Sequence, residues 1–106
     1  MNNETKAKDM KMVTDIKQVN DLLRVGYPLP QYHKTTPAYT IGELINFAKQ
    51  CAGDVVITNN RANGWFVGIK DTHVANFEDD ELIDCLFKFC MWIRLNAYYP
   101  YGFKTK

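Results

Sequence analysis

The sequence predicts an α+β domain in which a small antiparallel sheet is covered on one face by a long C-terminal helix. Apolar side chains recur at spacings of three and four residues within 82–97, which is typical of an amphipathic α-helix. Two β-branched and aromatic runs, 54–58 and 65–70, flank a turn-rich segment and indicate a β-hairpin. The run Thr-Ile-Gly-Glu at 40–43 marks the start of another helix. The expected order of elements is α-α-β-β-(β)-α.

Composition limits the classes to which the chain can belong. Its 106 residues fit one domain, and 13 Lys and Arg against 12 Asp and Glu leave a net charge of +1. This balance gives no field that would draw the chain to nucleic acid or to a membrane. Three cysteines without paired spacing favour buried thiols over disulfides, and no apolar run is long enough to span a bilayer. We therefore expect a cytoplasmic protein.

Three segments differ in character. Residues 1–12 are polar and without periodicity, so we expect a flexible N-terminal lead. Residues 13–98 carry the periodic apolar pattern and are predicted to form a single globular α+β domain. Residues 99–106 form an aromatic and basic C-terminal tail.

The first helix is predicted to begin after Asp15. Gln18 follows three residues later, which makes a capping-box variant. Gly26 suits the C-terminal end of the helix, and 27–37 is expected to be an extended connection stiffened by three prolines. The inward stripe of this helix comprises Ile16, Val19, Leu22 and Leu23.

The second helix has the clearest boundaries. Thr40 and Glu43 can form a reciprocal capping box, and Tyr39 and Leu44 are placed for the accompanying hydrophobic contact. Gly53 is expected to end the helix. Its inward positions are predicted to be Ile41, Leu44, Ile45, Ala48 and Cys51.

The predicted hairpin has two registers that place different side chains together. A two-residue turn at Asn63-Gly64 would put Val55 and Ile57 on the face opposite Trp65, Val67 and Ile69. A loop of three or five residues would collect all five side chains on one face. We therefore predict the odd-numbered loop. The segment 72–77 is expected to add a short third strand.

The C-terminal helix is the predicted core of the domain. Cys85, Phe87, Met91 and Trp92 add apolar surface beyond its main stripe, so both sides of the helix need a cover. We expect Asp84, Lys88 and Arg94 to mark its solvent edge, with Asp84 and Lys88 forming an ion pair four residues apart. The main stripe comprises Leu82, Ile83, Leu86, Phe89, Cys90 and Ile93.

Four acidic residues, 78–81, precede this helix. Negative charge is favourable at a helix N-terminus, and Asp79 or Asp80 is expected to cap the first turn. The alternative is a divalent-cation site built from these carboxylates. Capping explains the residues without an ion, so we expect no metal site.

Three motifs carry a resemblance that covers 15–98. These are PAYTIGELINFA, GWFVGIKD and FEDDELIDCLFKFCMWIRLN. In them the chain resembles a broad group of small uncharacterised proteins encoded by phages, prophages and other mobile elements of gut anaerobic bacteria. The resemblance implies a phage or mobile-element origin, and it carries no catalytic residues over to this chain.

No arrangement of catalytic residues can be argued from the sequence. The two histidines, His33 and His73, are 40 positions apart, and His73 near Asp71 is read as a loop or strand-edge residue in preference to a general base. Cys51 has no partner at zinc-ligand spacing, and no glycine-rich phosphate loop is present. We therefore expect a protein that is not an enzyme and needs no cofactor.

Two stretches are candidate binding sites. The C-terminal aromatic residues could stack on bases or enter a protein pocket, or they could fold back over the core. The polar hairpin tip could contact phosphate or a protein, although Asn and exposed Arg are common in any turn. The candidate binding residues are Tyr98, Tyr99, Tyr101, Phe103, Lys104, Arg61 and Asn60.

The two-sided apolarity of the C-terminal helix motivates the functional expectation, because a small domain has little material to cover both sides. We expect a non-catalytic phage or mobile-element accessory protein that acts by protein–protein binding, to a host factor or to itself as a homodimer. The alternative is a small nucleic-acid-binding module that uses the tail, with Lys106, and the hairpin tip at Arg61.

Overall fold

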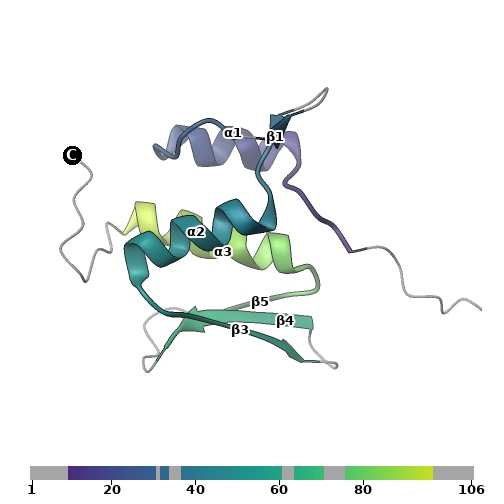
Figure 1. The fold of residues 1–106 in the computed structure, drawn as a ribbon, viewed down its shortest axis with the longest axis vertical. Coiled ribbons are helices and arrows are strands. Elements are labelled where there is room, and N and C mark those ends of the chain that lie inside the picture. Colours follow the sequence, from purple (N-terminus) through teal and green to yellow (C-terminus); the bar gives the residue numbers. More distant parts are fainter. Residues whose placement is uncertain (1–9, 31, 34–36, 61–63, 71–75, 97–106) are drawn as a thin grey trace, which may run out of the picture.

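The computed structural model describes residues 10–30, 32–33, 37–60, 64–70 and 76–96. Its elements follow the predicted order, with one additional pair of two-residue strands between the first two helices (Figure 1). The α+β fold, with a C-terminal helix over an antiparallel sheet, is confirmed. The elements are α1 (Ile16–Arg24), β1 (Tyr32–His33), β2 (Pro37–Ala38), α2 (Ile41–Ala52), β3 (Val55–Asn60), β4 (Gly64–Ile69), β5 (Asn76–Asp79) and α3 (Leu82–Leu95).

The domain is built in layers around α3. Figure 1 shows α1 on one side, α2 and α3 in the middle, and the three-stranded sheet on the other side. Strands β3, β4 and β5 are adjacent in that order and antiparallel throughout. Helix α3 packs against β4, β5, α1 and α2. It is therefore covered from three directions by elements of its own domain.

The predicted stripe of α3 is buried in full. All six stripe residues lie in the core, Cys85 is buried with them, and Phe87, Met91 and Trp92 are half-buried against the same cluster. Burying a large apolar side chain contributes roughly 1.5–3 kcal/mol, so this helix supplies a large share of the favourable free energy. In the part of the chain that the structure describes, no helix is both long and apolar enough to cross a bilayer.

Both predicted capping boxes are present. The Asp15 carboxylate accepts a hydrogen bond from the Gln18 amide at 2.8 Å, and Gln18 Oε1 accepts one from the Asp15 amide at 3.0 Å. Thr40 Oγ1 accepts from the Glu43 amide at 3.2 Å, and Glu43 Oε1 accepts from the Thr40 amide at 2.9 Å. Helix α2 ends at Gly53 as predicted. These local signals need no tertiary partner, which explains why the sequence was sufficient to find them.

The start of α3 differs from the prediction. Its N-cap is Glu81, whose side chain makes no capping bond, and Asp79 belongs to β5. The third strand runs from 76 to 79, later than the expected 72–77, and 71–75 lie outside the described residues. Phe77 pairs with Val67, and the pairing extends to Asp79, which lies opposite Trp65. The strand therefore includes Asp79, which the sequence suggested as a helix cap.

The hairpin has the predicted odd-numbered loop. Asn60 pairs with Gly64, so three residues connect the strands, and Ile57 pairs with Val67. Side chains alternate across a sheet, so one face receives the apolar set. That set, packed on the core, comprises Val55, Ile57, Trp65, Val67, Ile69 and Phe77.

Gly64 is the glycine on which this hairpin depends. Its φ is +87°, and a Cβ there would lie 2.8 Å from Asp80 Cα and still closer to the carbonyl oxygen of Asp79. Both neighbours are backbone atoms and cannot rotate away. We expect Gly64→Ala to lower the free energy of unfolding by about 2 kcal/mol or more, measured by urea denaturation.

Gly42 provides the matched control. It lies in the first turn of α2, and an added Cβ would meet only Thr40 Oγ1 at 3.9 Å. Gly42→Ala should raise the free energy of unfolding by up to about 1 kcal/mol, because alanine loses less conformational entropy in a helix. Equal effects of the two substitutions would contradict the assigned hairpin geometry.

Candidate interaction surface

The outer face of the three-stranded sheet points away from the helices. The strand register that turns Ile57 and Val67 inward turns the alternate residues outward. Val56 retains 38% of its accessible surface and is the most exposed large apolar side chain of the described strands. We define the outer face by its side chains, Val56, Thr58, Phe66, Asn76 and Glu78.

Phe66 is the aromatic residue of this face. It is half-buried but does not belong to the hydrophobic core. A Cβ added at Gly68 would meet Phe66 ring atoms at 3.2 Å, so the ring lies over that glycine and shields its backbone. Gly68 pairs with Val56 in β3. The ring and the valine therefore form one apolar patch at the centre of the outer face.

The two edges of the sheet have opposite character. Strand β5 is short and acidic, and Lys88 Nζ reaches it, donating to the Glu78 carbonyl at 3.2 Å and to Asp79 Oδ2 at 2.9 Å. Strand β3 has six residues and no charged side chain, and no strand in the described part of the chain pairs with its outer side. Charge and short length protect an edge from further pairing, so β5 is protected and β3 is open.

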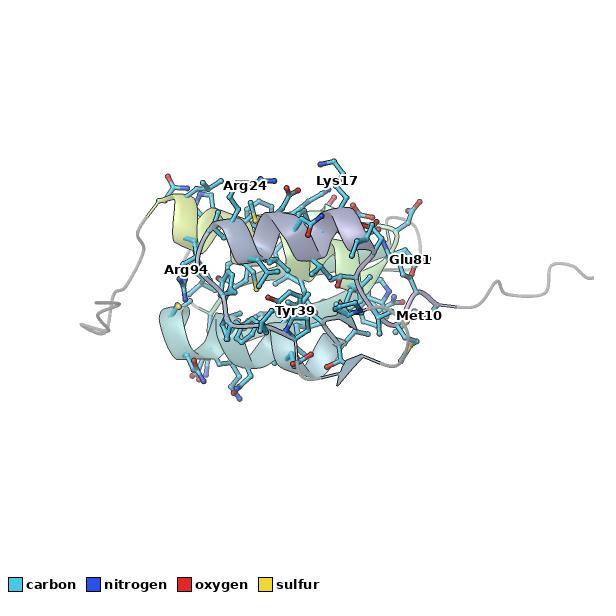
Figure 2. All side chains as sticks on the ribbon, turned by 90° about the horizontal axis from the view of Figure 1, so that it is seen from above. Met10, Lys17, Arg24, Tyr39, Glu81 and Arg94 are labelled. Atoms are coloured by element: carbon cyan, nitrogen blue, oxygen red, sulfur yellow. The ribbon has the colours of Figure 1, made fainter. Side chains whose placement is uncertain are left out.

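Acidic residues at the start of α3 bind the N-terminal segment. Glu81 Oε1 accepts from the Lys11 amide at 2.9 Å, and Asp84 Oδ1 accepts from Lys11 Nζ and from Gln18 Nε2, both at 2.8 Å. Figure 2 shows Glu81 and Met10 at the same end of the domain. Lys11, which the sequence placed in a flexible lead, is thus bound to α3, and residues 1–9 lie outside the description. Asp84 pairs with Lys11 and not with Lys88 as expected.

These carboxylates have protein partners, and the described residues contain no group of three or more His, Cys, Asp or Glu placed to hold a metal ion. Ion pairs and hydrogen bonds account for Asp79, Glu81 and Asp84 in the structure. The ion pairs join exposed or half-exposed side chains, so each contributes at most about 1 kcal/mol.

Arg94 was expected at the solvent edge of α3, and the structure instead packs it against the core. Its Cζ lies 4.2 Å from the centroid of the Tyr27 ring, and Nη1 donates to the Val25 carbonyl at 3.3 Å. The Tyr27 hydroxyl in turn donates to the Cys90 carbonyl at 2.8 Å. A cation over an aromatic face is favourable, and here it joins the end of α1 to the end of α3. Figure 2 shows Arg94 at the opposite end of the domain from Glu81.

The three thiols are buried and free, as the sequence predicted. Burial raises the pKa of Cys85 to about 11 and that of Cys90 to about 12. Burial also raises the pKa of Cys51, although the nearby Arg94 opposes the shift. The thiolate is the nucleophilic form, so these residues are inert packing groups at neutral pH. The described part of the chain also encloses no pocket.

Most of the residues proposed from sequence as binding residues lie outside the described part of the chain. Asn60 is the last residue of β3, and its side chain is not described. Of the histidines, His33 belongs to β1 and His73 lies outside the description. The residues not described are Tyr98, Tyr99, Tyr101, Phe103, Lys104 and Arg61.

The sequence reasoning missed Val56 and Phe66. The signal that could have found them was already present in the predicted odd-numbered loop. Once Ile57 and Val67 are assigned to the inner face, their sequence neighbours must occupy the other face. A valine and a phenylalanine on the face that does not contact the core are the residues to notice.

No family model matches the chain, and neither a curated protein nor a solved structure is significantly similar to it.

The pair of Asp79 and Lys88 should make stability depend on pH. Burial by itself would raise the pKa of Asp79, but hydrogen bonds from Lys88 and from the amides of Glu81 and Asp80 lower it below the ordinary 3.8. A lowered pKa in the folded state stabilises the fold above the unfolded value, and this contribution is lost as pH falls through the folded value. We expect Asp79→Asn to cost under about 1 kcal/mol at pH 7 and to cost less in acid.

Urea denaturation at pH 7 and at a pH well below 3.8 measures this difference. Lys88→Met and the double variant complete a mutant cycle that isolates the pair from the other effects of each substitution. A destabilisation by Asp79→Asn that is the same at both pH values would contradict the assignment.

Proposed function

We propose that this chain is a non-catalytic accessory protein of a phage or other mobile element that acts by binding another protein, either a factor of the bacterial host or a second copy of itself. The observation that carries the proposal is the open side of the sheet. Val56 and Phe66 form an apolar patch there, and the uncharged edge of β3 borders it.

The apolar surface that is free to meet a partner lies on the sheet and not on α3. The sequence suggested that α3 needs an external cover, and the structure covers α3 with α1, α2 and the sheet. Among the described residues, the surface left without a cover is the opposite face of the sheet (Figure 1). An antiparallel sheet commonly has one solvated face, and such faces are usually polar. Phe66 at its centre, together with Val56, gives this face the apolar core and polar rim that binding surfaces have.

The described basic side chains do not favour the nucleic-acid alternative. Four of them are committed to ion pairs with aspartates on or beside the helices, so they do not gather into a basic stripe that could track a phosphate backbone. These four are Lys11, Lys17, Arg24 and Lys88. Protein binding is therefore the function that the described surface supports best.

Affinity capture with the full-length chain from a lysate of an anaerobic gut bacterium tests the proposal. The captured protein is identified by mass spectrometry, purified, and titrated against the wild-type chain by calorimetry. Val56→Lys places a charge at the centre of the apolar patch. We expect it to weaken binding by at least about tenfold, because an unpaired charge at the centre of an interface loses its hydration.

Gln50→Lys is the matched control, since it adds the same charge at an exposed position of α2, away from the sheet. It should leave the affinity unchanged. The proposal fails if the wild-type chain captures nothing and light scattering finds only the monomer. It also fails if Val56→Lys and Gln50→Lys affect binding equally.

A further inference from the structure

We infer that two copies of this chain associate through their β3 strands, which pair antiparallel about a two-fold axis at Ile57 and join the two sheets into one. This inference rests on the proposed function, because it names the partner of the open side of the sheet. There are two alternatives. Either a strand of another protein pairs with this edge, or no strand pairs with it.

The direction of the backbone groups of β3 follows from one hydrogen bond. The Lys70 amide donates to the Asp54 carbonyl at 3.0 Å, so 54 and 70 form a hydrogen-bonded pair of the antiparallel ladder. Residues alternate between the two sides of a strand in such a ladder. Val56 and Thr58 therefore bond to β4, while Val55, Ile57 and Asn59 direct their amide and carbonyl groups to the open edge.

The opposite edge of the sheet agrees with this alternation. In β5 the same rule directs the groups of Asn76 and Glu78 outward. The outward carbonyl of Glu78 is the one that accepts from Lys88 Nζ. In β5, one outward group is therefore already hydrogen-bonded. No hydrogen bond within the described residues reaches the outward groups of β3.

The outward groups select one register for a symmetric pair. With the axis at Ile57, Val55 of each copy faces Asn59 of the other and Ile57 faces its own equivalent. Each of these three pairs exchanges two hydrogen bonds, which satisfies all the outward groups of both strands. An axis at Val56 or at Thr58 leaves one outward residue of each copy unpaired. With the axis at Ile57, the inner faces of the two sheets also point to the same side. Both α3 helices therefore lie on one side of the joined sheet.

Charge favours a second copy as the occupant. A two-fold axis brings identical residues together, so a charged edge strand repels itself, and β5 carries Glu78 and Asp79. Strand β3, with the sequence VVITNN, has no charge to repel. Its β-branched residues suit strand pairing, and it contains no proline or lysine of the kind that protects edges. The joined sheet would also place the two Val56 and Phe66 patches on one continuous face.

Two double variants test the association and its register. In the proposed pair, Val56 lies opposite Thr58 of the second copy on the outer face. Val56→Glu with Thr58→Lys then places opposite charges across the interface, while Val56→Glu with Thr58→Glu places like charges there. We expect sedimentation equilibrium of the full chain to show a dimer for the wild type and the first variant. The dimer of the second variant should be weaker by about tenfold or more.

The other symmetric registers give a different result. An axis at Val56 or at Thr58 would set Glu against Glu, or Lys against Lys, in the first variant, and that variant would then dissociate as well. Asn59→Pro is an independent variant that removes an outward amide without removing a bond to β4. It should weaken the dimer at least about tenfold while circular dichroism stays unchanged.

A wild-type chain that stays monomeric up to about millimolar concentration overturns the inference, as does a dimer on which the two double variants act alike. If the monomer still binds a host protein in a Val56-dependent manner, the inference fails and the proposed function stands. If that host binding is lost in Asn59→Pro, the edge accepts a foreign strand and not a second copy. If the chain is monomeric and binds nothing, both fail.

Discussion

The burial of α3 is the interaction on which the rest of the structure depends. Seven of its side chains are buried, and α1, α2 and the sheet each cover part of its circumference. A helix that is apolar on nearly all sides must be enclosed, and in the described part of the chain these are the elements that enclose it. The hairpin register follows from the same demand, because the odd-numbered loop is the one that turns Ile57 and Val67 toward the helix.

Enclosing α3 determines where the free surface remains. The described elements pack on one face of the sheet only, so they leave its outer face and its β3 edge uncovered. The polar contacts of the domain lie elsewhere: Lys88 closes β5, Lys11 joins the N-terminal segment to Asp84, and Arg94 packs on Tyr27. Exposed apolar patches and open edges mark interaction sites in small proteins. These features are the basis on which we propose association through the sheet.

The interior offers no competing explanation. Its cysteines are held as neutral thiols by burial. Nearby, the carboxylates of Asp79, Glu81 and Asp84 are engaged by Lys88, Lys11 and backbone amides. Groups that perform chemistry need access to a substrate and a pKa near the working pH. Neither condition is met by the buried thiols. The surface recognition that we propose therefore rests on the sheet and not on these interior groups.

The sequence by itself determined the elements whose signals are local. The capping boxes at Asp15 and Thr40, the end of α2 at Gly53 and the inward stripe of α3 were all predicted, because each depends on residues within a few positions of one another. Only the tertiary structure decided which residues meet from distant segments. Pairing with β4 drew Asp79 into a strand instead of a cap, and packing across α1 turned Arg94 inward. Sequence spacing cannot determine these contacts, because their partners lie far apart along the chain and come together only when the layers pack around α3.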